Sequence, residues 1–368
     1  KRDSIIYNMP GSLKLKGEVH PEAMKTAIQK MINRHEILRT EFLMINGEPV
    51  QKILDTVQAD YEYVVDTETT GSELMNSFVR PFDLSKVPLV RIKLVKRRDC
   101  YLLMIDTHHI ISDGMSMETF TQEITSLYNG GELQELKHQY KDYSEWMRTR
   151  DMSSQKQYWV KQFSDEIPVL DMPLDYTRPK EQSYKGAVTQ TIISKEIVSR
   201  IRSFARKTNT TEYIILLSAA MVLLSKYSRQ EDIIIGSPIS GRTHKDTENM
   251  LGIFINTLAM RGKPKCEKRY LDFLAEIKSS CLEAYENQEY PFEELIEEVK
   301  LKRDVARNPL FDVMLAFQNN EKEEIKFSKI DLKYSEYNGD VAKFDLLFDI
   351  KENRNKEFII ELEYCRSL

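Results

Sequence analysis

The feature that most constrains the fold is one irregular stretch with mixed strand and helix patterns on both sides of it. Residues 169–186, "VLDMPLDYTRPKEQSYKG", contain prolines and no apolar periodicity. A chain of 368 residues also exceeds what one hydrophobic core usually serves. We therefore predict an α/β fold of two lobes, with residues 1–170 in the N-terminal lobe and 171–368 in the C-terminal lobe.

The first half begins with a strand, a helix and a hairpin. Leu13 and Leu15 alternate with lysines, which predicts a short strand with one wet face. Asn46-Gly47 lies between two apolar runs and is a strong hairpin signal. The intervening helix has apolar residues at i, i+3, i+4 and i+7, namely Met24, Ala27, Ile28 and Met31.

The stretch "CYLLMID", residues 100–106, is apolar almost throughout. This pattern predicts a central strand that is buried on both faces, beside the alternating strand "PLVRIKLV". We expect Ser116 to cap the helix that follows and Gly130-Gly131 to end it. The predicted core stripe of that helix is Met117, Phe120, Ile124 and Leu127.

The second half repeats the mixture of strands and helices. Asn209 stands three residues before Glu212, which resembles a capping box, and the predicted helix after it is apolar nearly all round. Residues 269–288 predict another helix. The remaining apolar runs predict strands at 231–242, 251–261, 308–318, 343–350 and 358–365, the last two forming a hairpin.

Charge and cysteine usage exclude several classes of protein. With 53 basic and 58 acidic residues, the net charge of −5 gives no overall attraction to nucleic acid or to an anionic membrane. The four cysteines are far apart and form no C-x-x-C pair, so we expect reduced thiols in the cytoplasm. No signal peptide and no membrane-length apolar run is visible.

The segment "HHIISDG", His108 to Gly114, is the strongest candidate for chemistry. Successive strand side chains point to opposite faces, so only one of two adjacent histidines can face a cavity. A metal site that adds Asp106 and Asp113 is disfavoured, because adjacent histidines chelate poorly and no H-x-x-x-H spacing is present. A buried structural histidine beside a turn, or acid–base work by one histidine, both stay open from spacing alone.

Covalent catalysis has little support in the residues. No G-x-S-x-G elbow occurs, and no cysteine stands in a motif that suggests activation. An acyltransferase with this sequence should therefore move the acyl group directly between two bound substrates.

Several motifs carry a family resemblance. "HHIISDG" resembles the H-H-x-x-x-D-G signature of condensation domains of nonribosomal peptide synthetases. Six more motifs are similar to that family's and follow in its order, across about residues 5–365: "RHEILRTEF", "YKDYSEW", "IGSPISGR", "LGIFINTL", "NQEYPFEELIEEV" and "RNPLFDVML". The family's early S-x-A-Q-x-R motif and its C-terminal helix are absent, so we expect a fragment of a larger synthetase.

The resemblance implies a fold of two chloramphenicol-acetyltransferase-like lobes, a V-shaped pseudo-dimer with an active-site tunnel between them. It implies an upstream donor and a downstream acceptor carrier protein, each presenting a thioester on a phosphopantetheine arm, and a neighbouring adenylation domain. The acceptor amine would attack the donor thioester and form an amide, with an L-donor and L-acceptor expected. We expect no cofactor bound by the domain itself, no metal, no nucleic acid or membrane partner, and a monomer.

The same resemblance assigns roles within the motif. His109 would face the amine, as general base or as a group that positions it, and His108 would serve packing. Asp113 would form a bidentate pair with Arg242 across the lobe interface, because a buried carboxylate should find a cation. Gly114 would offer its backbone N–H to the tunnel.

Other residues receive supporting roles. We assign Arg34 and Arg39 to a buried scaffold of salt bridges, and expect Trp146 and Trp159 to serve packing rather than ligand stacking. The tunnel-lining residues would be Asn256, Ser112 and Ser240. For Asn256 the alternative is an amide that satisfies the backbone of a bulge.

Three related activities compete with condensation. Heterocyclisation is disfavoured, because such members carry aspartate in place of the two motif histidines. Epimerisation of a carrier-bound residue uses the same histidine and stays open. A non-catalytic domain that only docks carrier proteins is the third alternative.

Overall fold

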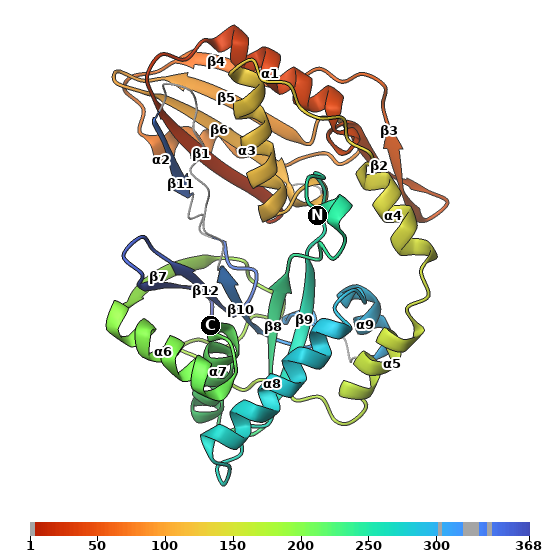
Figure 1. Cartoon of the computed structure of the whole chain (residues 1–368), viewed down its shortest axis with the longest axis vertical. Helices are drawn as coiled ribbons and strands as arrows, with labels where there is room; N and C mark the ends of the chain where they lie inside the picture. Colours follow the sequence, from red (N-terminus) through yellow and green to blue (C-terminus); the bar gives the residue numbers. More distant parts are fainter. Residues whose placement is uncertain (1–3, 301–303, 319–330, 337–340) are drawn as a thin grey trace. The chain divides into compact units, whose positions relative to one another are not determined.

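The computed structural model describes residues 4–300, 304–318, 331–336 and 341–368 (Figure 1). The chain divides into two compact units. The first unit comprises residues 1–150, 242–254 and 322–338, and the second comprises 151–241, 255–321 and 339–368. The predicted boundary at residue 170 thus falls inside the second unit. Two later segments belong to the first unit, which no local sequence pattern had indicated.

The first unit is built on a five-stranded sheet in the order β11-β1-β6-β5-β4. Its strands are β1 (Asn8–Lys16), β4 (Asp60–Val65), β5 (Val90–Lys96), β6 (Tyr101–His108) and β11 (Asp331–Glu336). The strand β6 lies between β1 and β5 and is buried along most of its length, which confirms the predicted central strand. Its end is therefore a rigid place from which to present the motif histidines.

Helices cover both faces of this sheet. On one face, α1 (Pro21–Arg34) and α3 (Gly114–Tyr128) pack against each other and share one core with β1, β5 and β6 (Figure 1). On the other, α2 (Gly71–Phe78) contacts Val95 and Met104, whose neighbours Leu94 and Leu103 belong to the first core. Strand alternation thus explains why the central strand has no polar face.

A separate hairpin joins β2 (Thr40–Ile45) to β3 (Glu48–Ile53). Asn46 and Gly47 have φ of 54° and 86°, the positive values that a type I′ turn requires at both central positions. The hairpin prediction is confirmed. The short helix η1 (Glu36–Arg39) precedes β2, and α4 (Tyr140–Thr149) follows later in the same unit.

The second unit contains a six-stranded sheet in the order β7-β13-β12-β10-β8-β9. Its strands are β7 (Gly186–Ile193), β8 (Ile233–Ile239), β9 (Asn256–Gly262), β10 (Val313–Gln318), β12 (Leu346–Glu352) and β13 (Phe358–Cys365). The predicted hairpin of the last two strands is confirmed by their antiparallel register. The parallel strand β10 lies between β8 and β12.

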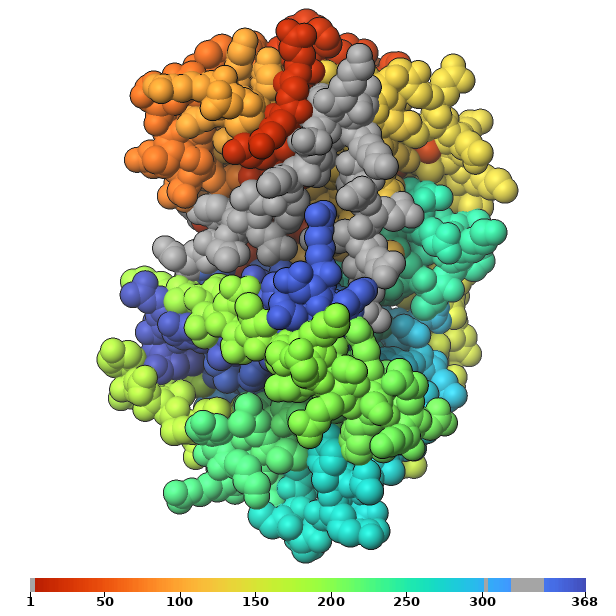
Figure 2. Space-filling model, turned by 60° about the vertical axis from the view of Figure 1, so that its left-hand side comes forward, coloured from red at the N-terminus to blue at the C-terminus, as the bar shows by residue number. Residues whose placement is uncertain are grey.

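Five helices accompany this sheet: α5 (Ser153–Gln162), α6 (Lys195–Thr208), α7 (Glu212–Ser228), α8 (Tyr270–Glu286) and α9 (Phe292–Glu298). Figure 2 shows the region of α6 (green) and that of α8 (cyan) at the surface of this unit. The helix α7 is buried along most of its length, as its apolar sequence predicts. It supplies the centre of the second core.

Two sequence predictions in the second half are wrong in detail. Asn209 does not cap α7: it ends α6 in the left-handed conformation with φ of 49°, while the Thr211 side chain accepts a hydrogen bond from the Ile214 N–H at 3.3 Å. The end of α6 and the start of α7 are separated by three residues, and Asn is a favoured residue type at both kinds of helix end, so the pattern alone fits either position. The strand predicted from residue 251 begins only at Asn256, because residues 251–254 belong to the first unit.

Within the described ranges, no single helix has the length and apolar character needed to cross a membrane. Only α6 and α7 taken together pass that test, and the chain bends by 102° between them.

Candidate active site

The motif histidines lie where β6 ends. His108 is the last residue of β6, and His109 begins a short 3-10 turn, His109–Ile111, that leads toward α3. The His108 N–H donates to the Leu89 carbonyl at 3.0 Å, and the His109 N–H donates to the Tyr7 carbonyl at 2.8 Å. His109 therefore stands on the turn and not on the strand, so the strand alternation that we expected does not apply between the two histidines.

The His108 ring is held in place by local contacts. Its Nδ1 accepts a hydrogen bond from the Ile110 N–H at 3.1 Å. The ring centroid lies 6.2 Å from that of Tyr7 and 6.1 Å from that of Phe82, the latter in an edge-on arrangement. An Nδ1 that accepts implies that the proton of neutral His108 is on Nε2. These contacts agree with the packing role given to His108.

Asp113 is the N-cap of α3. Its side chain is 4% exposed, and its Oδ1 accepts from the Ser116 N–H at 2.8 Å. Its Oδ2 accepts from the Phe254 N–H at 2.9 Å. A carboxylate at a helix N-terminus is favoured by the free N–H groups and by the helix dipole. The prediction that Ser116 caps this helix is therefore wrong, and Asp113 performs that function.

Arg242 lies beside Asp113, with its side chain only 2% exposed. Its Nη2 is 3.3 Å from Asp113 Oδ1. Its Nη1 donates to the carbonyls of Thr247 and Met250, and its guanidinium lies 4.0 Å above the Phe254 ring. The predicted ion pair between Asp113 and Arg242 is present, but it is not bidentate. Only Nη2 contacts the carboxylate, because Nη1 donates to the two backbone carbonyls. Both residues also belong to the first unit, so this ion pair does not cross between the units.

A single buried hydroxyl joins these groups. Ser116 Oγ donates to the Gly252 carbonyl at 2.7 Å and accepts from the Gly252 N–H at 3.2 Å. It also accepts from Arg242 Nη2 at 2.8 Å. Ser116 has no exposed surface, so each of these contacts is made away from water. Together with Asp113 it fixes the segment 242–254 to the start of α3.

Two further motifs meet on the same segment. The Tyr140 hydroxyl donates to the Ile253 carbonyl at 2.8 Å, and its ring packs edge-on against Phe254 at 5.3 Å. A Cβ on Gly252 would lie 2.0 Å from Tyr140 Cδ2, so only glycine fits there. These contacts join the motifs "YKDYSEW" and "LGIFINTL", and nothing within either motif indicates that they meet.

Arg34 and Arg39 have different partners. Arg34 Nε lies 3.2 Å from a Glu123 carboxylate oxygen, and His35 Nε2 lies 2.6 Å from the same oxygen. Glu123 comes from α3, and its position among the core residues of that helix was the signal that sequence reasoning missed. In the part of the chain that the structure describes, Arg39 donates to backbone carbonyls, among them that of Ile32 at 3.1 Å. Its assignment to a salt bridge is corrected accordingly.

The Asn256 amide is used fully within the second unit. Its Nδ2 donates to the carbonyls of Gln288 and Tyr290, both at 2.8 Å. Its Oδ1 accepts from the N–H groups of Thr257 at 2.8 Å and Phe292 at 3.1 Å. This is the backbone-satisfying alternative for Asn256, and it fixes the start of β9 to the residues before α9.

The other predicted tunnel residues lie in two different units. Ser112 is buried and its Oγ donates to the Asp113 carbonyl at 3.4 Å. Gly114 is exposed at the first position of α3, with open space where a Cβ would stand. Ser240 is exposed and follows β8 in the second unit. Their roles at a tunnel stay predictions.

The two tryptophans also differ. Trp159 is 3% exposed in the core of the second unit, and its Nε1 donates to the Asn287 carbonyl at 2.8 Å, as a packing role requires. Trp146 is 38% exposed, and the Arg150 guanidinium lies 4.3 Å above its ring. The Trp146 ring also lies 6.0 Å from that of Tyr143 and 6.3 Å from that of His244, so it packs against neighbours while part of its surface stays in water.

Asp106, which we had considered as a metal ligand, is engaged elsewhere. It is fully buried, and its Oδ2 lies 3.0 Å from Arg91 Nη1 and accepts from Asn8 Nδ2 at 2.8 Å. Burial raises the pKa of Asp106 to about 6, against the opposing effect of Arg91. Across the described ranges, no group of three histidine, cysteine, aspartate or glutamate residues is placed to hold a metal ion.

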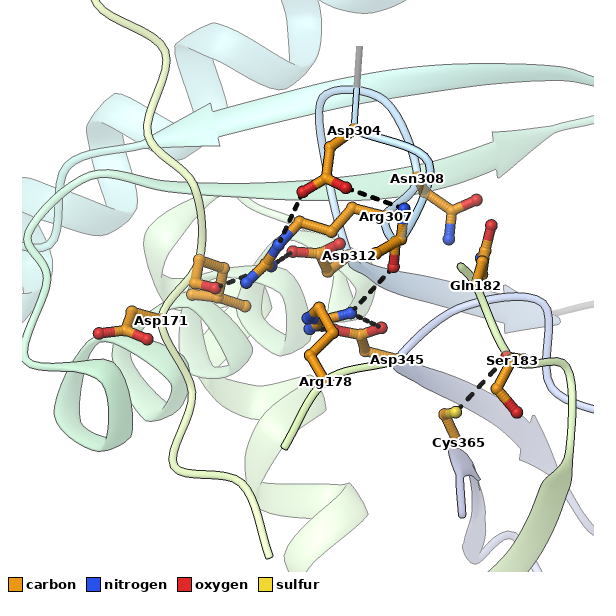
Figure 3. A network of polar contacts seen from close by, with 12 residues as sticks. Asp171, Arg178, Gln182, Ser183, Asp304, Arg307, Asn308, Asp312, Asp345 and Cys365 are labelled. Atoms are coloured by element: carbon orange, nitrogen blue, oxygen red, sulfur yellow. Dashed lines mark hydrogen bonds and ion pairs between the residues drawn. The ribbon is translucent and has the colours of Figure 1, made fainter. Parts of the chain in front are cut away.

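The second unit contains its own partly buried ion pairs (Figure 3). Arg307 pairs with Asp312 and donates to the Leu170 carbonyl at 3.2 Å. Arg178 pairs with Asp345. Burial raises the pKa of Asp312 to about 6. This network ties the irregular stretch 169–186 to the strands of the second sheet, which explains how an aperiodic segment is held in one conformation.

The chain resembles known proteins along its whole length. The family model described as Condensation domain matches residues 1–368. Gramicidin S synthase 2 of Brevibacillus brevis is 43% identical over 371 residues, which cover 99% of this chain and 8% of that synthase. The chain therefore spans less than a tenth of that relative's length.

Solved structures with the same fold include the following two. The X-domain from teicoplanin biosynthesis superposes with a TM-score of 0.90 at 22% identity, covering 98% of this chain and 86% of that one. The condensation domain from the monacolin K polyketide synthase gives 0.87 at 20% identity, covering 99% and 88%. The mixed α/β fold class predicted from the sequence is confirmed.

Proposed function

This chain belongs to the condensation-domain family, and we propose that it joins a donor acyl or peptidyl thioester to the α-amine of an acceptor aminoacyl thioester. The observation that carries the proposal is the position of His109. It lies on a turn that backbone hydrogen bonds fix to Tyr7, between the end of a central strand and a helix capped by Asp113. Its side chain is partly exposed, as contact with a substrate requires.

The chemistry needs few protein groups. A thioester is already activated, so much of the rate acceleration can come from holding the amine and the thioester in attack geometry. His109 then either accepts the proton of the amine, a contribution of about 10²–10⁴-fold, or orients the amine. An α-amine with a pKa of about 8 is partly neutral at pH 7, so orientation alone is chemically sufficient.

We infer the partners from the same chemistry. Both substrates would be carried on phosphopantetheine arms, by a donor and an acceptor carrier protein, with an adenylation domain in the same synthetase. We expect the donor and the acceptor residues to have the L configuration. We also expect the reaction to take place in the cytoplasm and the domain to be a monomer. The tunnel between two lobes, lined by Ser112, Ser240 and Gly114, belongs to this proposal.

The test is direct. The chain is incubated with two loaded carrier proteins, and dipeptidyl thioester is measured by mass spectrometry. His109→Ala should lose at least 90% of the product, about tenfold or more, while binding of both carriers is retained. His20→Ala is the control, because His20 is exposed before α1 and its side chain does not cap that helix. Full activity of His109→Ala would refute the assignment.

Epimerisation is the alternative within the same family. It would give exchange at the α-carbon of a carrier-bound residue and no amide. A docking domain would bind both carriers and give neither product. The same incubation therefore separates the three functions, and donors of D and L configuration test the stereochemical preference.

A further inference from the structure

A buried charged cluster joins three neighbouring strands close to the end of β6, two residues before the first motif histidine. Asn8 of β1, Arg91 of β5 and Asp106 of β6 form it, and we call it the Asp106 cluster. The side chains of Arg91 and Asp106 are 6% and 0% exposed. Asp106 Oδ2 contacts Arg91 Nη1 at 3.0 Å and Asn8 Nδ2 at 2.8 Å.

Such a cluster needs a reason beyond stability. Taking two charges out of water costs several kcal/mol per ion, and a hydrophobic replacement of similar volume is often as stable. Asp106 Oδ1 and Asn8 Oδ1 are also buried with no hydrogen-bond partner among the described residues. Burying these charges and unpartnered oxygens lowers the stability of the fold, so a role in positioning neighbouring residues would explain why the cluster is present.

The Asp106 cluster holds the segment Arg80–Phe82. The Arg80 carbonyl accepts from Arg91 Nη1 at 2.5 Å and from Asn8 Nδ2 at 3.0 Å. The Pro81 carbonyl accepts from Arg91 Nη2 at 3.3 Å. The Phe82 ring lies under the Arg91 guanidinium, 3.6 Å from its Cζ to the ring centroid. Two members of the cluster thus fix both the backbone of this segment and its aromatic side chain.

Phe82 in turn contacts the motif. Its ring meets the His108 ring edge-on at 6.1 Å, and Tyr7 lies 6.2 Å from the same ring. Tyr7 is the neighbour of Asn8 in the chain, and its carbonyl accepts the His109 N–H at 2.8 Å. The cluster is therefore connected to His108 through Phe82, and to the backbone of His109 through Asn8 and Tyr7.

We propose that Asp106 is a positioning residue, which through Arg91 and Phe82 on one side and Asn8 and Tyr7 on the other sets the position of His108 and of the turn carrying His109. Asp106 does not touch substrate in this scheme. It orients Arg91 and Asn8, and these two orient the residues that contact the histidines. The consequence for activity rests on the proposed amide-forming function, whereas the consequence for the His108 ring does not.

The test uses Asp106→Asn, which keeps the shape of the side chain and removes its charge. Ring ¹³C–¹H NMR of histidine-labelled protein reports on His108, since the chain has only six histidines and His108→Ala assigns the signal. Loss of the Phe82 contact should move the His108 signals, and Phe82→Leu should move them in the same direction. In the condensation assay, kcat should fall about 10- to 100-fold, with KM for the loaded carriers unchanged.

Asp312→Asn is the matched control, because Asp312 is also a buried partner of an arginine but lies in the second unit. It should lower stability and leave the His108 signals and kcat unchanged. Unmoved His108 signals in Asp106→Asn would overturn the proposal, whereas Phe82→Leu shows how large a shift the loss of the Phe82 ring itself produces. If Asp106→Asn does not fold, Arg91→Lys takes its place, because it keeps the charge beside Asp106 and removes the Nη2 bond to the Pro81 carbonyl; unmoved His108 signals in that variant would overturn the proposal. If the wild type forms no amide, the proposed function fails, and the NMR arm still tests the positioning.

Discussion

Ser116 offers the sharpest test of how the segment 242–254 is held. Ser116→Ala removes one oxygen that makes hydrogen bonds to the Gly252 carbonyl, the Gly252 N–H and Arg242 Nη2. All three groups lie at a fully buried site, so water does not replace the lost contacts. Arg242 Nη2 keeps Asp113 as a partner, but the Gly252 groups lose their side-chain partner.

The expected loss of stability in Ser116→Ala follows from the hydrogen bonds that this substitution removes. Each buried group left unsatisfied costs about 1–3 kcal/mol. With the two Gly252 groups left without their side-chain partner and a weakened contact to Arg242, we expect a loss of about 2–5 kcal/mol in the free energy of unfolding. Thr125→Val is the matched control in the same helix, since Thr125 Oγ1 is buried and, among the residues that the structure describes, donates to the Thr121 carbonyl alone, at 2.7 Å. Its expected cost is below about 1 kcal/mol.

The assay is urea unfolding followed by tryptophan fluorescence. Trp146 lies in the first unit and Trp159 in the second, so a Trp159→Phe background makes the signal specific for the unit that contains Ser116. The midpoint should fall in Ser116→Ala with the slope unchanged. If Ser116→Ala costs no more than Thr125→Val, the hydroxyl does not hold the segment and the reasoning is wrong.

Three further outcomes are expected. The pKa of Asp106 in the folded protein is raised from 3.8 to about 6, so the native state keeps this proton to a higher pH than the unfolded state does. The stability of wild type relative to Asp106→Asn, measured by urea unfolding across pH 4–7, should therefore fall by up to about 3 kcal/mol as the pH rises. A slope of the opposite sign would contradict the raised pKa. Gly252→Ala should cost about 1–3 kcal/mol, because its Cβ would meet the Tyr140 ring. A double variant with Tyr140→Ala should cost less than the sum of the two single variants, and additive costs would contradict the clash. Glu123→Ala leaves Arg34 and His35 without their carboxylate and should cost about 3–5 kcal/mol by urea midpoint; a change under about 1 kcal/mol would mean that the pair adds little.

Local sequence patterns predicted the local features well. The central strand β6, the Asn46-Gly47 turn and the β12–β13 hairpin each depend on residues close in the chain. The predictions of where helices begin were less accurate. Asp113 and Ser116 both suit an N-cap, and only the contact with Arg242, more than a hundred residues away, explains why the hydroxyl of Ser116 is used elsewhere.

The parts that the sequence did not predict depend on distant contacts. The pairing of Asp106 with Arg91 and Asn8 joins three strands, and no periodicity within one strand indicates it. The partner of Arg34 and His35 was hidden in the same way, since Glu123 belongs to a helix that looks amphipathic without it. The family motifs marked where such contacts gather, but not which atoms make them.

The assignment of residues 242–254 to the first unit has a consequence for recombination. A chimera that exchanges N-terminal and C-terminal halves between two relatives, with a single crossover in the stretch 151–241, would take Asp113 from one parent and Arg242 from the other. The Gly252 that must fit against Tyr140 would also come from the second parent. An exchange that respects the packing has to carry 242–254 together with residues 1–150, as two separate inserts. Chimeras built in that way should retain the helix cap and the arginine contact that a single crossover divides between parents.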